Sequence, residues 1–201
     1  PDLIVLPGSK NTIEDAQFLQ ESGLALAINQ VLNATNAHVI GICGGYQMLG
    51  ETITDPDAVE SRIESIKGLG LLPVETVMTT SKKTERVSGY VQLESEEVSI
   101  EGYEIHMGKT VSKSMTEAFA VVDDQKEGTV KENIIGTYVH DVFHNDALRR
   151  ALLNQIRKHK KLPPITDTFN SRLQKEESFS KAAAYVREAV DMEKLYHLID
   201  N

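Results

Sequence analysis

The sequence predicts an α/β fold built around a mostly parallel central sheet. A short apolar strand at residues 3–6 is followed by two helical segments and then by a second apolar strand at 37–42. This order of strand, helix and strand gives parallel neighbouring strands joined by right-handed crossovers. A third apolar run at 134–139 supplies another strand, and short β-rich runs between 68 and 122 predict a second layer of strands.

Composition places the chain among globular proteins with an acidic surface. Its 201 residues are enough for one large domain with a sizeable core. A formal net charge of -9 argues against nucleic acid as a partner, because binding it requires a basic face. The single cysteine cannot form an internal disulfide, so we expect a reduced, cytoplasmic protein. No apolar run reaches membrane-spanning length, and no membrane partner is expected.

The chain opens directly on a predicted strand. Pro1 has no initiator methionine before it, and no basic and apolar leader is present. We therefore expect this sequence to be a piece of a longer polypeptide.

Two helices are predicted after the first strand. The turn at 7–11 leads into a helix whose first residues, 12–15, have capping-box spacing. A second helix begins near 22–23. Its apolar residues lie on one face: Leu24, Ala27, Ile28, Val31 and Leu32. The loop after the first strand contains Gly8, and the second strand leads into Cys43. Since ligands bind at the carboxyl ends of parallel strands, we expect Gly8 and Cys43 to face each other.

The rest of the chain is predicted as loop, strands and helices in turn. Residues 51–67 are polar and are predicted to form a loop with a turn at 55–57. The predicted short strands of the second layer are 70–74, 86–91, 103–107 and 118–122. Asn145 and Asp146 cap a helix that runs to about 159. After Pro163-Pro164 the tail is polar, with one or two amphipathic helices over 179–198.

Cys43 has the surroundings of a catalytic nucleophile. It lies on the predicted turn between a buried strand and a helix that starts at Gly44. Gly41, Gly44 and Gly45 leave room for close backbone packing and for a substrate. The helix N-terminus favours the thiolate, and the Gly44 amide can donate to an oxyanion. The alternative interpretation is a small buried apolar residue without chemistry.

His140 is the second candidate catalytic residue. It follows an apolar strand, as Cys43 does, so the same sheet edge would bring the two together. An imidazole can accept the proton of a thiol near neutral pH. The alternative is a strand-end histidine bound only to backbone. A zinc site is not expected, because His140 lies in a turn and no second cysteine is available, although His144 has helical spacing from His140 and His106 could join them.

Several segments together resemble one known family. They are residues 7–12 (PGSKNT), 41–47 (GICGGYQ), 102–108 (GYEIHMG) and 136–140 (GTYVH), with Asp55-Pro56 and 68–73 (GLGLLP) between them. Their order and spacing closely resemble the glutamine amidotransferase domain of the cobyric acid synthases. The resemblance implies a class I, flavodoxin-like, three-layer domain over residues 1–160, lacking its first strand-helix-strand unit. Residues 161–201 are then a C-terminal helical tail.

The resemblance also implies a reaction and assigns residues to it. Cys43 would be the nucleophile that hydrolyses glutamine, and His140 would be its base. Gly8 and Gly44 would contribute oxyanion amides, and Gln47 would contact glutamine. Ammonia would pass to an ATP-dependent synthetase domain earlier in the same polypeptide, which amidates adenosylcobyrinic acid a,c-diamide, a corrinoid acceptor in cobalamin biosynthesis. No cofactor or metal is expected in this chain, whereas ATP and Mg²⁺ would bind to the synthetase domain.

One position departs from the class I pattern at large. Many class I amidotransferases carry an acid two residues after the catalytic histidine, and Val142 stands there in this chain. The cobyric acid synthases are similar in keeping only the cysteine and the histidine. A backbone carbonyl, a water molecule or a distant acid such as Glu104 would have to orient His140. If His140 were not the base, His106 would be the first candidate to replace it.

Three other functions stay open from the sequence. The same glutaminase chemistry serves other acceptors, because cobyrinate a,c-diamide synthase and the glutaminase subunit of lipid II isoglutaminyl synthase resemble this domain. A thiol esterase of α/β-hydrolase type would need an acid between Cys43 and His140 in chain order. A catalytically silent domain could use the same cleft to bind glutamine, but the presence of both Cys43 and His140 argues against it.

Overall fold

The computed structural model describes residues 1–93, 96–167 and 169–199. These residues form two compact units, one of residues 1–165 and one of the residues that follow. All the predicted site residues belong to the first unit. No helix in the described ranges is both long and apolar enough to cross a membrane.

A four-stranded sheet forms the centre of the first unit. Its order is β1 (Leu3–Leu6), β2 (His38–Ile42), β10 (Ile134–Thr137) and β9 (Thr129–Lys131). The first three strands are parallel, and β9 is antiparallel to β10. The predicted α/β class with a mostly parallel central sheet is therefore confirmed.

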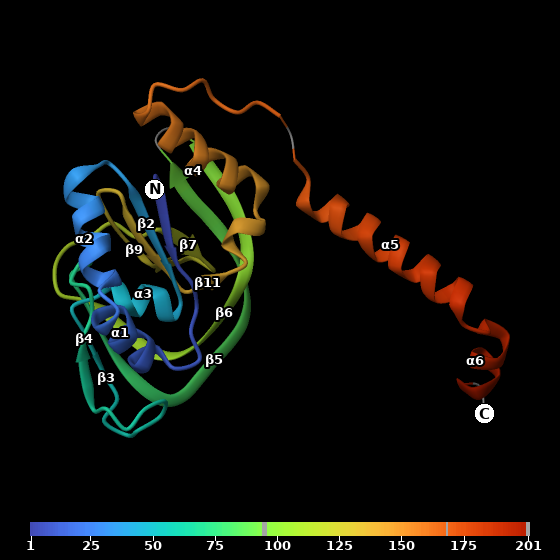
Figure 1. Ribbon diagram of the computed structural model, residues 1–201, viewed down its shortest axis with the longest axis horizontal. Helices are drawn as coiled ribbons and strands as arrows, with labels where there is room; N and C mark the ends of the chain where they lie inside the picture. The colour runs from blue at the N-terminus through green and yellow to red at the C-terminus, as the bar shows by residue number, and fades with distance from the viewer. Residues whose placement is uncertain (94–95, 168, 200–201) are drawn as a thin grey trace. The chain divides into compact units, whose positions relative to one another are not determined.

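The helices of this unit are α1 (Thr12–Glu21), α2 (Leu24–Ala34), α3 (Gly44–Leu49) and α4 (Asp146–His159). They cover the two faces of the sheet unequally. Val39 of β2 packs in one core cluster with Ile13 of α1 and Ile28 of α2. Ile40, the next residue, packs in another cluster with Leu148 of α4, because successive side chains of a strand point to opposite faces. Figure 1 shows α1 and α2 on one side of the central strands and α4 on the other.

The start of α1 differs in detail from the prediction. Asn11, and not Thr12, is the N-cap, because its side chain accepts a hydrogen bond from the Glu14 amide at 3.2 Å. The Thr12 amide donates instead to the carboxylate of Glu60, 2.9 Å away. This contact ties the first turn of α1 to the segment that follows α3.

A second sheet of seven strands carries the added β structure. Its strands are β3 (Thr52–Thr54), β4 (Ser65–Lys67), β5 (Val74–Leu93), β6 (Glu96–Ser112), β7 (Ala120–Val122), β8 (Gln125–Glu127) and β11 (Val139–His140). Strands β5 and β6 form a long antiparallel ribbon, visible as the two curved green strands in Figure 1. Their register shifts between Met78 and Lys83, which lets the ribbon bend.

Three predictions for this second layer were wrong in detail. The predicted loop at 51–67 contains β3 and β4, which pair with each other and extend the sheet beyond β5. The predicted strand at 70–74 is a bend that becomes a strand only at Val74. The separate strands predicted at 86–91 and 103–107 are parts of the long β5 and β6 ribbon.

The apolar run at 134–139 is also not one strand. It leaves the central sheet after Thr137 and enters the second sheet at Val139, where β11 pairs with β6. The break is held by buried Glu127, which accepts the Thr137 hydroxyl at 2.7 Å and the Tyr138 amide at 2.6 Å. The crossing places His140 opposite Tyr103, and a short 3-10 turn at Val142–His144 then leads to α4.

The second unit contains two helices, α5 (Ser171–Ala189) and α6 (Met192–Ile199). Helix α5 begins earlier than the predicted helical span of 179–198, because the Asn170 side chain caps it by accepting the Leu173 amide at 2.9 Å. None of the described residues of either helix is buried.

Helix α3 packs unusually close to the central sheet. A Cβ built on Gly41 of β2 would lie 2.6 Å from the backbone of Gly45. A Cβ on Gly45 would overlap the carbonyl group of Leu6 in β1. Glycine at both positions therefore allows the start of α3, and with it the preceding turn, to lie directly against β1 and β2.

Replacing Gly45 by alanine should destabilise the fold strongly. The atoms that the new Cβ meets are backbone and cannot rotate away. Overpacking costs about 1–3 kcal/mol or more, so we expect the free energy of unfolding, measured in urea, to fall by at least about 2 kcal/mol. Gly8→Ala is the control, since a Cβ there meets nothing closer than 3.4 Å. Equal stability of Gly45→Ala and wild type would contradict the close packing of α3.

Candidate active site

The predicted turn at Cys43 is present and has strained backbone geometry. Cys43 lies between β2 and α3, with φ 53° and ψ -112°. A positive φ is uncommon for a residue with a Cβ and costs of order 1–3 kcal/mol. The turn is held because the Cys43 amide donates to the Thr137 carbonyl at 2.8 Å, and the Cys43 carbonyl accepts the Gln47 amide at 3.1 Å. The side chain is thus presented in a fixed direction at the end of β2.

Cys43 and His140 meet at one backbone oxygen. The Cys43 thiol donates to the Ile105 carbonyl at 3.4 Å, and the His140 Nε2 atom lies 3.3 Å from the same oxygen. The cysteine reaches it from the turn after β2, and the histidine reaches it from β11 across the ribbon strand β6. The structure therefore brings together the two candidate residues that the sequence placed at neighbouring strand ends.

Gly8 lies beside both Cys43 and His140. A Cβ built on Gly8 would be 3.4 Å from Cε1 of His140 and 3.7 Å from Cβ of Cys43. Gly44 begins α3, where backbone N–H groups have no acceptor within the helix. The two glycines predicted as oxyanion donors therefore both lie beside the thiol.

Burial controls the charge of the thiol. Cys43 is 8% exposed, and this burial raises the pKa of the thiol above that of a free cysteine. The backbone N–H of Gly44 lowers the pKa in part, while the negative charge of Glu60 raises it further. The expected effect of the helix N-terminus is present at the Gly44 amide, but burial outweighs it, and the pKa of Cys43 is raised overall. A thiol in this environment needs a base to react near neutral pH.

No acid follows His140 at the position typical of class I enzymes. Val142 stands there and is 1% exposed in the core, within the cluster that includes Leu148 and Leu152. The group that contacts the imidazole is instead the Ile105 carbonyl. This contact is a hydrogen bond only when Nε2 carries a proton, so the group that orients the imidazole stays a prediction.

Glu104 cannot orient His140 in this fold. His140 pairs with Tyr103 across β11 and β6, so Glu104, the next residue, points to the opposite face of the sheet. There the carboxylate of Glu104 forms an ion pair with Lys83 and lies 3.6 Å from Nε2 of His106. These contacts hold the pKa of Glu104 below its usual range, with the hydrogen bond to His106 as the largest cause.

His106, the alternative base, lies on that same opposite face. Its Nδ1 atom is 2.8 Å from the Gly108 carbonyl, and its ring stacks on Tyr138 with centroids 3.8 Å apart. These contacts lock the ring into the wall of the core. No contact between His106 and Cys43 is present among the described residues, so His140 is the better placed base.

Gln47 is part of a buried polar chain. It is 2% exposed, and its side-chain nitrogen donates to the Tyr138 hydroxyl at 3.2 Å. That hydroxyl is also bonded to Thr110, and Thr110 to Thr76 at 2.7 Å. Gln47 therefore braces α3 against β6 through Tyr138. Its predicted contact with glutamine stays a prediction.

Glu127 supports the same region from the other side of Tyr138. Burial raises the pKa of Glu127 to about 7, although the Tyr138 amide and the Thr137 hydroxyl both donate to its carboxylate and lower it. The two bonds fix the point where the chain leaves the central sheet. Glu127 is thus a positioning residue for the strand that ends at His140.

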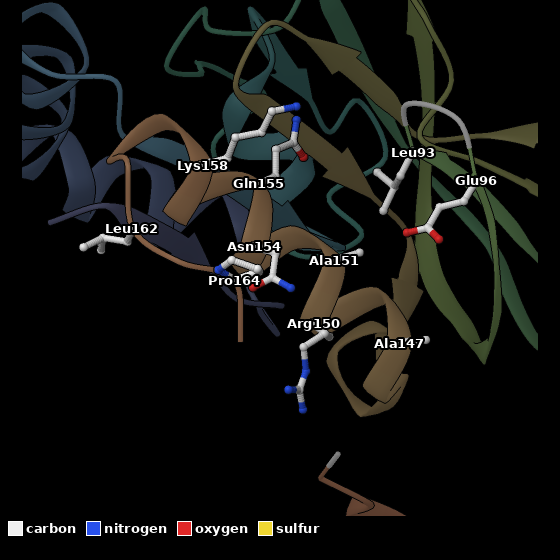
Figure 2. Close-up of a pocket in the computed structure, with 10 residues that line it drawn as sticks. All are labelled: Leu93, Glu96, Ala147, Arg150, Ala151, Asn154, Gln155, Lys158, Leu162 and Pro164. Carbon is white, nitrogen blue, oxygen red and sulfur yellow. The ribbon is translucent and has the colours of Figure 1, made fainter. Parts of the chain in front are cut away.

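Two cavities of the first unit lie outside the contact between Cys43 and His140. One of about 950 Å³ is lined by polar side chains that include Glu104, His106, Glu127 and Tyr138. Another of about 720 Å³ runs along α4, between Leu93 and Pro164 (Figure 2). Neither contains Cys43 or His140. Within the described parts of the chain, no group of three or more His, Cys, Asp or Glu side chains is arranged to hold a metal ion.

Sequence reasoning missed three contributors to the site. The Ile105 carbonyl is a backbone atom, and no residue pattern marks it. Glu127 lies in a polar stretch where burial is not visible. Glu60 follows the Asp55-Pro56 turn in the segment predicted as loop, and that turn was the only signal of ordered structure near it.

Comparison with known proteins gives one consistent result. Residues 1–148 match the family described as the CobB/CobQ-like glutamine amidotransferase domain. The chain is 44% identical to a protein named cobyric acid synthase from Geobacillus kaustophilus, over 99% of this chain and 40% of that protein. It is 43% identical to the cobyric acid synthase of Anoxybacillus flavithermus, over 97% of this chain and 39% of that protein. The chain thus spans about two fifths of the length of these relatives.

A solved structure supports the fold. PurLQS from Thermotoga maritima matches with a TM-score of 0.53 and 16% identity, over 77% of this chain and 80% of that chain. Another match, with a TM-score of 0.53 and 12% identity, is a crystal structure of a glutamine amidotransferase. At these identities the similarity concerns the fold alone.

Cys43 should be alkylated slowly at neutral pH and faster as the pH rises. Because burial raises the pKa of Cys43, the rate of iodoacetamide modification, followed by mass spectrometry, should have its midpoint above the ~8.5 of a free cysteine. A synthetic peptide of residues 41–47 is the control, since its thiol is exposed. A midpoint in the protein below that of the peptide would contradict the dominance of burial.

Proposed function

Because the chain belongs to the CobB/CobQ-like glutamine amidotransferase family, we propose that it hydrolyses glutamine with Cys43 as nucleophile and His140 as base. The observation that carries this assignment is the convergence of the thiol and the imidazole on the Ile105 carbonyl. Both lie against Gly8, whose missing side chain leaves space for a substrate amide. The family match supports glutamine as the substrate, and the geometry supports Cys43 and His140 as the reacting residues.

The reaction then follows acyl-transfer chemistry. His140 Nε2 accepts the thiol proton, and the sulfur attacks the side-chain amide carbon of glutamine. The backbone amides of Gly8 and Gly44 donate to the oxyanion that forms. The protonated imidazole returns its proton to the leaving nitrogen, so ammonia departs and a γ-glutamyl thioester remains on Cys43. Water, deprotonated by His140, then attacks the thioester and releases glutamate and the thiol.

The Ile105 carbonyl contacts Nε2 of His140, the nitrogen that reacts in this scheme, and not Nδ1, the nitrogen that an acid partner would bind. In the resting site it accepts a hydrogen bond from the Cys43 thiol and lies 3.3 Å from Nε2 of His140. Once Nε2 carries the proton, the same contact becomes a hydrogen bond from a charged donor, which is about twice as strong as a neutral one. The carbonyl thereby stabilises the imidazolium during acylation.

The ammonia is proposed to serve a synthetase region of a longer polypeptide. Support comes from the relatives, which are named cobyric acid synthase and are longer than this chain. We infer a corrinoid acceptor, adenosylcobyrinic acid a,c-diamide, whose peripheral carboxylates become amides at the expense of ATP with Mg²⁺. Neither ATP nor the corrinoid is assigned to residues of this chain, and the cytoplasm is the proposed location.

Cys43→Ala in the full-length protein should separate the two half-reactions. Wild-type protein should amidate the corrinoid with either glutamine or ammonium salts as nitrogen source, measured by mass spectrometry of the product. The variant should lose the glutamine-dependent reaction and keep the ammonia-dependent one, because only the former needs the thiol. Glutamine-dependent amidation by Cys43→Ala would remove Cys43 from the mechanism, and glutaminase activity without corrinoid amidation would point to another acceptor.

His140 and Val142 should differ sharply in their contribution to glutamine hydrolysis. General-base catalysis contributes about 10²–10⁴-fold, so His140→Ala should lower kcat by that order. Val142→Ala, at the position of the acid in other enzymes, should change kcat far less, because valine can neither accept a proton nor stabilise the imidazolium. Circular dichroism of both variants at the assay temperature is the check that they are folded. Equal losses in two folded variants would assign the proton transfer to another group.

A further inference from the structure

Glu60 is held rigidly in the segment after α3. Asp55, 2% exposed, accepts three backbone N–H groups, from Val59 at 2.7 Å, Glu60 at 2.9 Å and Ser61 at 3.0 Å. The side chain of Glu60 is fixed as well, because one oxygen accepts the Thr12 amide at 2.9 Å. This carboxylate is therefore positioned by contacts at both its backbone and its head group.

The Glu60 carboxylate is close to the nucleophile turn. Thr12, to which it is bonded, is 1% exposed, and its hydroxyl would lie 3.0 Å from a Cβ on Gly44, the residue after Cys43. The negative charge of Glu60 contributes to the raised pKa of Cys43. Glu60 thus lies at the first turn of α1, which packs beside Gly44.

A fixed negative charge at this place is unfavourable for the free protein. It opposes ionisation of the thiol that must become the nucleophile. No lysine or arginine in the described ranges forms an ion pair with Glu60 that would balance its charge. Glu60 also lines a cavity of about 450 Å³, together with Glu14, Ser61 and Arg62, so the carboxylate is open to a small ligand. Because Glu60 has no ion-pair partner among the described residues, its charge is available to a cation from outside the chain.

We propose that Glu60 binds the α-ammonium group of the glutamine substrate and selects α-amino acid amides over other amides. The inference rests on the proposed glutaminase function. Glutamine carries its only positive charge at the α-carbon, a short carbon chain away from the reacting amide. Glu60 lies in a comparable place beside the nucleophile, because it binds Thr12, whose hydroxyl is close to Gly44, the residue after Cys43. Binding of this charge neutralises Glu60 and removes its opposition to thiolate formation. The nucleophile is then most reactive when the correct substrate is bound.

The substitution Glu60→Gln tests the proposal. The new side-chain amide keeps a carbonyl oxygen that can accept the Thr12 amide, and only the negative charge is removed. The full-length protein is assayed with L-glutamine and with glutaramate, which has a hydrogen in place of the α-amino group. Hydrogen bonds to charged groups have an effect of about 10–100-fold on binding, so we expect the KM for glutamine to rise by that factor in the variant. The rate with glutaramate should stay within about twofold of wild type, so the preference for glutamine falls. Without substrate, the midpoint of Cys43 alkylation should move to lower pH.

Glu14→Gln is the matched control, because Glu14 lines the same cavity but does not act on the pKa of Cys43. It should behave as wild type with both substrates. If Glu60→Gln kept the wild-type preference for glutamine, or lost activity with both substrates equally, the proposal would be overturned while the glutaminase function stood. Absence of glutamine hydrolysis by the wild-type protein would overturn both.

Discussion

The site depends on a single crossing of the chain between two sheets. Strand β10 runs parallel to β2 and ends at Thr137, and β11 begins at Val139 in the other sheet. The crossing is stable because Glu127 satisfies the hydroxyl of Thr137 and the amide of Tyr138, which would otherwise be buried without partners. Without it, β10 would continue in the central sheet, and His140 would not reach the Ile105 carbonyl on β6.

The same packing that builds the site also sets its electrostatics. Glycines at 41 and 45 allow α3 to lie against the sheet, and the resulting burial of Cys43 raises the pKa of its thiol. A thiol with a raised pKa needs a base to react near neutral pH. In the proposed mechanism His140 supplies the base, and the Ile105 carbonyl accepts a hydrogen bond from the imidazolium, which has no carboxylate partner. In the proposed substrate binding, Glu60 adds a negative charge whose effect on the thiol depends on whether glutamine is bound.

The sequence was sufficient for features that depend on local pattern and insufficient for those that depend on packing. Cys43 and His140 each follow an apolar run. These runs predicted the parallel sheet, and their shared edge predicted that the two residues lie close together. The run at 134–139 (IIGTYV) has the composition of one continuous strand, so nothing in it marks the break at Tyr138. Strands β3 and β4 are short and polar and exist because they pair with each other and β3 with β5. The raised pKa of Cys43 is a consequence of burial, which glycine spacing alone does not reveal.

The account's central claim is that Cys43 carries the γ-glutamyl group during turnover. The most direct measurement is acid quenching of the full-length protein during turnover with isotopically labelled glutamine, followed by peptide mapping with mass spectrometry. We expect the labelled acyl group on the peptide that contains Cys43, in an adduct that hydroxylamine cleaves as it does a thioester. Steady glutamine hydrolysis with no label on Cys43, or with label on a different side chain, would contradict the claim.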